Sequence, residues 1–210
     1  MGYIGIIFTV YFFMANINSL NMVDGIDGLL GALSLVSLIT LAIFLSISDS
    51  SFASVPIVIS AALTSYLIFN FKIASFIPKI FMGDAGAMLL GFTVSWLIII
   101  SVVIEEVFRL VSILYIIALP FIDMIFTIFN RIGKGQSPIR PQRDHIHHRL
   151  MNRGFSTSQT VGITTLLALI IATIGFLGEL SNINDLNMLL MFLFIMICFT
   201  YYFIHTSKYK

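Results

Sequence analysis

Charged residues are scarce in this chain: they make up 10% of its 210 residues, against about 25% in a soluble domain. Apolar residues make up 59%, and the mean hydropathy is +1.04. This balance excludes a water-soluble globular enzyme and also excludes intrinsic disorder, which requires low hydrophobicity. A net charge of only +1 excludes a nucleic-acid-binding protein. The remaining class is a polytopic membrane protein.

Cysteine is also scarce, since Cys198 is the only one and lies in an apolar run, so the chain has no intrachain disulfide. Long uncharged runs dominate instead. A span needs about 20 apolar residues, and within lipid only a helix satisfies the backbone of such runs. We therefore expect an all-α fold that forms a single transmembrane domain over 1–210. The expected transmembrane helices, about seven in all, are 1–18, 29–47, 55–71, 87–104, 110–130, 160–178 and 187–205.

The basic residues lie almost entirely on one side of these spans. Ten of the eleven fall in 18–28, 72–86, 131–159 and the tail 206–210, and only Arg109 falls on the other side. The positive-inside rule makes the first side cytoplasmic. We therefore expect the loops on this side to face the cytoplasm. Its polar motifs, including the cytoplasmic basic and histidine loop 131–159, would form an active site facing the cytoplasm, where nucleotide-activated substrates and magnesium are present.

The first polar motif runs from Asn18 to Leu29, where one span ends and the next begins. Asn21, Asp24 and Asp27 are spaced by three residues, so on a helix they would share one broad face. Carboxylates this close repel each other unless a cation lies between them or one is protonated. The alternative is an ordinary polar turn between helices.

The second motif, 81–87, contains Asp84 between two glycines just before a span. A carboxylate beside exposed backbone N–H groups suits Mg²⁺, which binds oxygen ligands and usually bridges to substrate phosphate. The alternative is an aspartate that caps the start of the helix.

The third motif lies in the longest polar loop and contains Arg143, His145, His147 and His148. Arginine binds phosphate through two parallel hydrogen bonds, so a pyrophosphate-binding loop fits this mixture. A zinc site fits less well because the loop has no cysteine and the arginines oppose a cation. A basic loop attracted to anionic lipid would explain the arginines but not the histidines.

Two isolated polar residues also stand out. Asp123 lies within the span 110–130, about 12 Å from its cytoplasmic end at 1.5 Å per residue. A carboxylate at this depth either reaches the site or bonds to a neighbouring helix. Asn70, at the cytoplasmic end of the third span, either binds a substrate or caps its helix.

Together, the order and spacing of Asn18-x-x-Asn21-Met22-Val23-Asp24-Gly25-Ile26-Asp27-Gly28-Leu29, Phe81-Met82-Gly83-Asp84-Ala85-Gly86 and Arg143-x-His145-Ile146-His147-His148 resemble the polyprenyl-phosphate N-acetylhexosamine-1-phosphate transferase family. The nearest branch is the bacterial undecaprenyl-phosphate GlcNAc-1-phosphate transferase branch. This resemblance implies transfer of GlcNAc-1-phosphate from UDP-GlcNAc to undecaprenyl phosphate with release of UMP. That reaction is the first step of lipid-linked cell-surface polysaccharide synthesis, as for O-antigen lipopolysaccharide or wall teichoic acid.

Both the resemblance and the chemistry of phosphoryl transfer assign roles to these residues. Mg²⁺, with Mn²⁺ as a substitute, would be held by Asp84 and Asp27, and Asp24 would complete the shell or position the lipid phosphate. The expected catalytic residues are Asp24, Asp27, His145, His147 and His148, and the expected substrate-binding residues are Asn21, Asn70 and Arg143. The expected partners are UDP-GlcNAc, undecaprenyl phosphate and membrane lipid, and a homodimer is compatible with the sequence.

Two departures from the family pattern shape these expectations. Family members are longer, so the chain corresponds to their C-terminal portion, lacks their N-terminal Asp-Asp motif and is expected to have little activity alone. Ala87 also replaces the serine that usually follows the Gly-Asp motif. The rival interpretations are a membrane transporter of an anionic solute and an inactive scaffold. A transporter would normally have broken or repeated helices near the midplane of the membrane.

Overall fold

The computed structural model describes residues 3–73, 76–137 and 145–205, and all regular structure in these ranges is helical. The α-helices are α1 (Tyr3–Val23), α2 (Leu29–Ile47), α3 (Ser54–Asn70), α4 (Gly83–Ile99), α5 (Ile113–Ile116), α6 (Ala118–Gly133), α7 (Ile146–Asn152), α8 (Thr157–Leu180) and α9 (Asp185–His205). Short 3-10 turns precede α3 (Ser51–Ala53) and α5 (Leu110–Ser112), and α4 continues as a π-helix over Ile100–Ile104. The predicted all-α fold is confirmed.

In the part of the chain that the structure describes, six helices are long and apolar enough to cross a membrane. The bent pair formed by Leu110–Ile116 and Ala118–Gly133 makes a seventh if it is one span. The fold is therefore that of a polytopic membrane protein. The boundaries shift modestly: α1 extends to Val23 and α4 begins at Gly83, so Asn21 and Asp84 lie on helices rather than in the connections between them.

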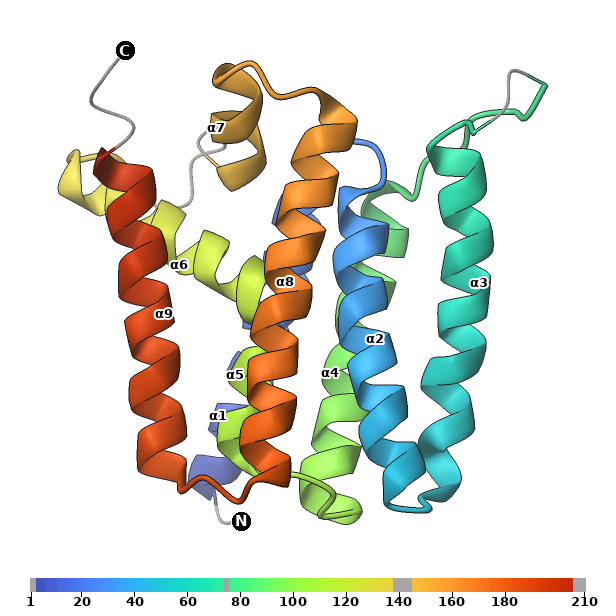
Figure 1. Cartoon of the computed structure of the whole chain (residues 1–210), viewed down its shortest axis with the longest axis vertical. Helices are drawn as coiled ribbons and strands as arrows, with labels where there is room; N and C mark the ends of the chain where they lie inside the picture. The colour runs from blue at the N-terminus through green and yellow to red at the C-terminus, as the bar shows by residue number, and fades with distance from the viewer. Residues whose placement is uncertain (1–2, 74–75, 138–144, 206–210) are drawn as a thin grey trace.

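The prediction of one continuous helix over 110–130 is wrong. The chain breaks at Ile117 and bends by 83° between α5 and α6. Pro120 has no N–H to donate to the carbonyl of Ile116, so the regular helical bond is missing at this point. The Ser37 hydroxyl on α2 donates to that carbonyl instead, at 2.8 Å. Beyond the break, α6 runs obliquely towards the upper end of α9 (Figure 1).

Helix α2 lies at the centre of the bundle between α3 and α8, and Leu38, Leu41 and Leu45 are completely buried on it. Helices α1 and α4 run antiparallel and pack closely. A Cβ at Gly91 would lie only 2.6 Å from the Ile17 Cα, so a side chain there would separate the two helices. The Asn16 amide on α1 also donates to the Ser95 hydroxyl on α4 at 2.8 Å.

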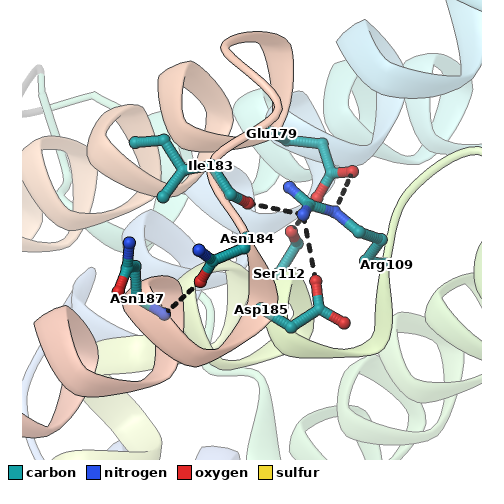
Figure 2. A network of polar contacts seen from close by, with 7 residues as sticks. All are labelled: Arg109, Ser112, Glu179, Ile183, Asn184, Asp185 and Asn187. Atoms are coloured by element: carbon teal, nitrogen blue, oxygen red, sulfur yellow. Dashed lines mark hydrogen bonds and ion pairs between the residues drawn. The ribbon is translucent and has the colours of Figure 1, made fainter.

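The two ends of the bundle differ. The connection 24–28, the described parts of the connection 71–82 (71–73 and 76–82) and helix α7 lie at the upper end in Figure 1, which we call the motif end. At the opposite end, Figure 2 shows Arg109 joining the segment before α5 to the turn between α8 and α9. Its guanidinium donates to Glu179 at 2.9 Å, to Asp185 at 3.0 Å and to the Ile183 carbonyl. The Ser112 hydroxyl also donates to Glu179.

Candidate active site

The turn between α1 and α2 is held in place by Asn70. Gly28 adopts a positive φ of 80°, and its N–H donates to the Asn70 side-chain oxygen at 2.6 Å. A side chain at Gly28 would overlap the ring of Phe71. The Asn70 amide nitrogen donates to the Ile80 carbonyl at 2.8 Å. Asn70 is buried and ties the connections 24–28 and 71–82 together, and its role in substrate binding stays a prediction.

Three carboxylates gather beside this turn. Burial raises the pKa of Asp24, and the negative charges of Asp84 and Asp27 raise it further. These charges act at short range, so the structure brings the first two motifs together although 60 residues separate Asp24 from Asp84. Lys79 compensates part of the negative charge, since its Nζ lies 2.6 Å from Asp27 Oδ2. Three acids against one lysine leave an excess of negative charge.

The acidic cluster fits a cation site that substrate would complete. Over 3–73, 76–137 and 145–205, no group of three or more His, Cys, Asp or Glu side chains is arranged to hold a metal ion. Mg²⁺, however, is usually held by one or two carboxylates together with waters and substrate phosphate oxygens. A bound cation would also relieve the repulsion that penalises the Asp24 charge. The assignment of Asp84 and Asp27 as metal ligands stays a prediction.

The histidine segment, which we define as residues 145–148, is anchored from below by α6. His145 Nδ1 lies 3.1 Å from Asp123 Oδ2, and the Ile146 N–H donates to Asp123 Oδ1 at 2.9 Å. The Thr127 hydroxyl lies 3.4 Å from the same ring nitrogen. His145 and Asp123 are both buried, so the broken span holds the start of α7.

His147 connects the histidine segment to the first motif. It is 1% exposed, and a Cβ at Gly25 would overlap its imidazole ring. The ring is stacked parallel to that of His145 at 5.9 Å and lies 4.2 Å from that of His148. Burial, followed by the neighbouring His148, lowers the pKa of His147 to about 4. The ring is therefore neutral at pH 7, and neither of its nitrogens has a hydrogen-bond partner among the described residues.

Two arginines after the histidine segment hold α7 against α6 and α9. The Arg149 guanidinium lies 4.7 Å from the centre of the Phe126 ring and donates to the Phe203 carbonyl at 3.3 Å. Arg153 lies 5.2 Å from the ring of Phe203. These cation–π contacts give the cations a packing role in addition to their charge. The predicted phosphate ligand Arg143 lies outside the described residues.

Asn21 lies in the last turn of α1, and its side-chain oxygen is buried without a hydrogen-bond partner in the described ranges. Such an atom is costly unless a ligand or water completes it, which fits the predicted binding role. Ala87, which stands where the family usually has serine, is fully buried on α4. Sequence reasoning missed the contacts of Lys79 and Gly25. The position of Lys79 five residues before Asp84 was a usable signal, whereas no local pattern indicates the contact between Gly25 and His147.

Comparisons with known proteins extend this picture. Residues 1–102 match the family described as Glycosyl transferase family 4. Three similar proteins are named undecaprenyl-phosphate alpha-N-acetylglucosaminyl 1-phosphate transferase. The one from Escherichia coli K12 is 40% identical over 116 residues, which are 55% of this chain and 32% of that protein. For Haemophilus influenzae the identity is 42% over 113 residues (52% and 32%), and for Pasteurella multocida it is 45% over 98 residues (46% and 28%).

The chain therefore spans about a third of the length of the curated relatives that it matches. The family match includes Asn21, Asp24, Asp27 and Asp84 of the first two motifs and also Asn70, and it ends before Asp123 and the histidine segment. The family resemblance predicted from the motifs is confirmed over this part of the chain.

Proposed function

We propose that the motif end carries the active site of a glycosyl-1-phosphate transferase that moves GlcNAc-1-phosphate from UDP-GlcNAc to undecaprenyl phosphate and releases UMP. The observation that carries the proposal is the convergence of the three aspartates with the histidine segment through the contact of His147 with Gly25. The relatives' names supply the substrates, and the chemistry of the site fits two phosphate-bearing reactants.

The reaction brings two anions together. An oxygen of the lipid phosphate attacks the β-phosphorus of UDP-GlcNAc, the bond from that phosphorus to the bridging oxygen breaks, and UMP leaves with the electron pair. Positioning and charge stabilisation provide most of the catalysis in such reactions. Mg²⁺, or Mn²⁺ in its place, would offset the charge of the phosphates. Asp84 and Asp27 would hold the ion, and Asp24 would orient its waters or the lipid phosphate.

The histidine segment supplies hydrogen bonds to the phosphates. His147 is neutral at pH 7, so it acts as a hydrogen-bond donor through one nitrogen rather than as a positive charge. His145, His148 and Arg143 would bind the diphosphate or the departing UMP. The unpartnered oxygen of Asn21 would accept a hydrogen bond from the nucleotide. Asn70 contributes by holding the turn that carries Asp27.

We also propose that the protein lies in the bacterial inner membrane with the motif end facing the cytoplasm. By sequence, ten of the eleven basic residues fall in 18–28, 72–86, 131–159 and 206–210, the segments predicted to be cytoplasmic, and this distribution follows the positive-inside rule. This orientation gives the site access to cytoplasmic UDP-GlcNAc, while the lipid substrate approaches from the bilayer.

The first test measures binding of UDP-GlcNAc to the purified chain in lipid nanodiscs by isothermal titration calorimetry, with Mg²⁺ or with EDTA. We expect binding that requires the divalent cation and that competes with UMP. Cation-independent binding, or none, would contradict the proposed site.

The second test separates a transferase from a transporter of an anionic solute. Proteoliposomes that contain the chain and undecaprenyl phosphate are incubated with UDP-GlcNAc labelled in the sugar. A transferase gives label in the lipid extract and an equal amount of UMP, at the low level expected of this chain alone. A transporter gives intact UDP-GlcNAc inside the vesicles.

A further inference from the structure

Asp123 is a carboxylate inside the broken span, and it is 3% exposed. A carboxylate at membrane depth is costly unless its oxygens are paired. Both Asp123 oxygens contact the start of the histidine segment: Oδ2 lies 3.1 Å from His145 Nδ1, and Oδ1 accepts a hydrogen bond from the Ile146 N–H. The side chain is thus committed to a segment more than 20 residues away along the chain.

The break in the span explains how Asp123 reaches this position. Because the chain bends by 83° at Ile117, α6 crosses the bundle below α7 instead of continuing straight along α5 (Figure 1). Thr127, one turn after Asp123, adds a second oxygen near His145 Nδ1 at 3.4 Å. Two successive turns of α6 therefore face the same imidazole nitrogen.

When Asp123 is ionised its carboxylate only accepts hydrogen bonds, and a hydrogen bond at 3.1 Å then requires the proton on His145 Nδ1. This leaves Nε2 as the nitrogen that can accept a proton or, once protonated, donate to a phosphate oxygen. The second bond, to the Ile146 N–H, fixes the entry into α7 one residue before His147, whose ring packs on Gly25 beside Asp24. One side chain thus sets both the tautomer of His145 and the placement of the segment.

We propose that Asp123 is a positioning residue for the transfer reaction: it holds His145 in the Nδ1–H tautomer and fixes the histidine segment over the turn that carries the aspartates. This inference rests on the proposed function, which assigns the histidine segment to binding of the substrate phosphates. A purely structural carboxylate would stabilise the fold and could still set the tautomer of His145, but it would not control the affinity for nucleotide sugar.

The decisive measurement is the ¹⁵N NMR spectrum of the ring nitrogens in the full chain, labelled at histidine and held in nanodiscs at pH 7.5. The His145 signals are assigned with His145→Gln. We expect a protonated Nδ1 and an unprotonated Nε2. The variant Asp123→Asn keeps the shape and can still accept from the Ile146 N–H, but its amide donates to Nδ1 and should move the proton to Nε2.

UDP-GlcNAc binding supplies the functional measurement. We expect Asp123→Asn to weaken affinity about tenfold, the lower end of the roughly 10–100-fold loss seen when the carboxylate partner of a metal-ligating histidine is removed. Asp123→Glu keeps the carboxylate and should therefore keep the Nδ1–H tautomer of His145. It should restore the affinity for UDP-GlcNAc less fully, because the longer side chain displaces the histidine segment. Asp185→Asn, which removes a carboxylate at the opposite end, should leave both measurements unchanged.

Three results would overturn the inference: an Nε2–H tautomer in the wild-type chain, unchanged His145 signals in Asp123→Asn, or unchanged affinity in that variant. The wild-type spectrum decides even if the variant does not fold. If the wild-type chain binds no UDP-GlcNAc, the proposed function fails, and with it the catalytic task given to Asp123. The spectra would then still show whether Asp123 controls the tautomer.

Discussion

The two ends of the bundle handle charge in opposite ways. At the opposite end, Arg109 bonds to Glu179, Asp185 and a backbone carbonyl, so each of these two acids has a direct hydrogen bond to a cation within the protein (Figure 2). At the motif end, three aspartates face Lys79, and the charge of Asp24 is penalised by its neighbours. The first arrangement stabilises the fold, whereas the second leaves negative charge that a bound cation can compensate.

The histidines sharpen this contrast. A ring as deeply buried as that of His147 usually has a hydrogen-bond partner, yet both of its nitrogens lack one within the described part of the chain. Buried donors and acceptors without partners reduce stability by about 1–3 kcal/mol each. The unpartnered nitrogens of His147 therefore reduce the stability of the motif end, and a ligand that forms hydrogen bonds with them would remove this cost.

The largest expected effect is the loss of cation-dependent binding in Asp84→Asn. A neutral amide is a weaker ligand for a hard cation, so we expect UDP-GlcNAc affinity in Mg²⁺ to fall at least about 100-fold, or about 2.7 kcal/mol. Titration calorimetry in nanodiscs measures this. Asp49→Asn, at the opposite end, is the control and should bind normally. Normal affinity in Asp84→Asn would remove Asp84 from the metal site.

Breaking the Arg109 network at the opposite end should reduce stability and leave UDP-GlcNAc affinity nearly unchanged. Glu179→Gln removes the charge that bonds to both Arg109 and Ser112, and we expect the free energy of unfolding to fall by about 2 kcal/mol. Denaturation in micelles measures the loss. UDP-GlcNAc affinity should stay within about twofold, because the network lies far from the site. A large loss of affinity with unchanged stability would contradict the division between the two ends.

A smaller effect is expected from Gly25→Ala, because the new Cβ would displace the ring of His147. Overpacking of this kind costs about 1–3 kcal/mol, and we expect about a tenfold loss of UDP-GlcNAc affinity. The matched control is Gly162→Ala on α8, where no atom lies within 4 Å of the added Cβ. Equal affinities for the two variants would show that His147 does not need to contact the turn.

The smallest effect concerns pH. The pKa of His147 is lowered to about 4 from 6.5, so the unfolded chain binds this proton at pH 6 and the folded chain does not. Stability is therefore complete above the unfolded pKa and is lost as the pH falls from about 6.5 towards 4, by about 1 kcal/mol between pH 7.5 and 6. The difference in melting temperature between wild type and His147→Gln should follow this dependence. A difference that does not change with pH would contradict the lowered pKa.

Local pattern predicted much of the molecule. Uncharged runs of about 20 residues have one stable form in lipid, so the helical spans followed directly. Because successive loops lie on alternating sides of the membrane, the span order then predicted Asp24, Asp84 and the histidine segment at one end. The bend at Ile117 was missed because the run 110–130, which is uncharged apart from Asp123, predicts one span. Pro120 was the local signal for a break, whereas the bond that satisfies the broken position comes from Ser37, far away in sequence.

The hydrogen-bond partners of single polar residues also could not be predicted from the sequence pattern. Nothing in the neighbourhood of Asp123 indicates that it bonds to His145 rather than to a nearby helix, because the contact depends on the direction in which α6 leaves the break. Asn70 is a similar case: an amide at a helix end suits either a substrate or a backbone, and its contacts with Gly28 and Ile80 depend on how two connections pack.

The close contact between Gly91 and Ile17 has a mechanical consequence. Asp24 follows the last residue of α1 and Asp84 lies in the first turn of α4, so both carboxylates are carried by helices whose backbones touch and are bonded through Asn16 and Ser95. These two helices form one stiff frame, and the separation of the carboxylates is a property of that frame.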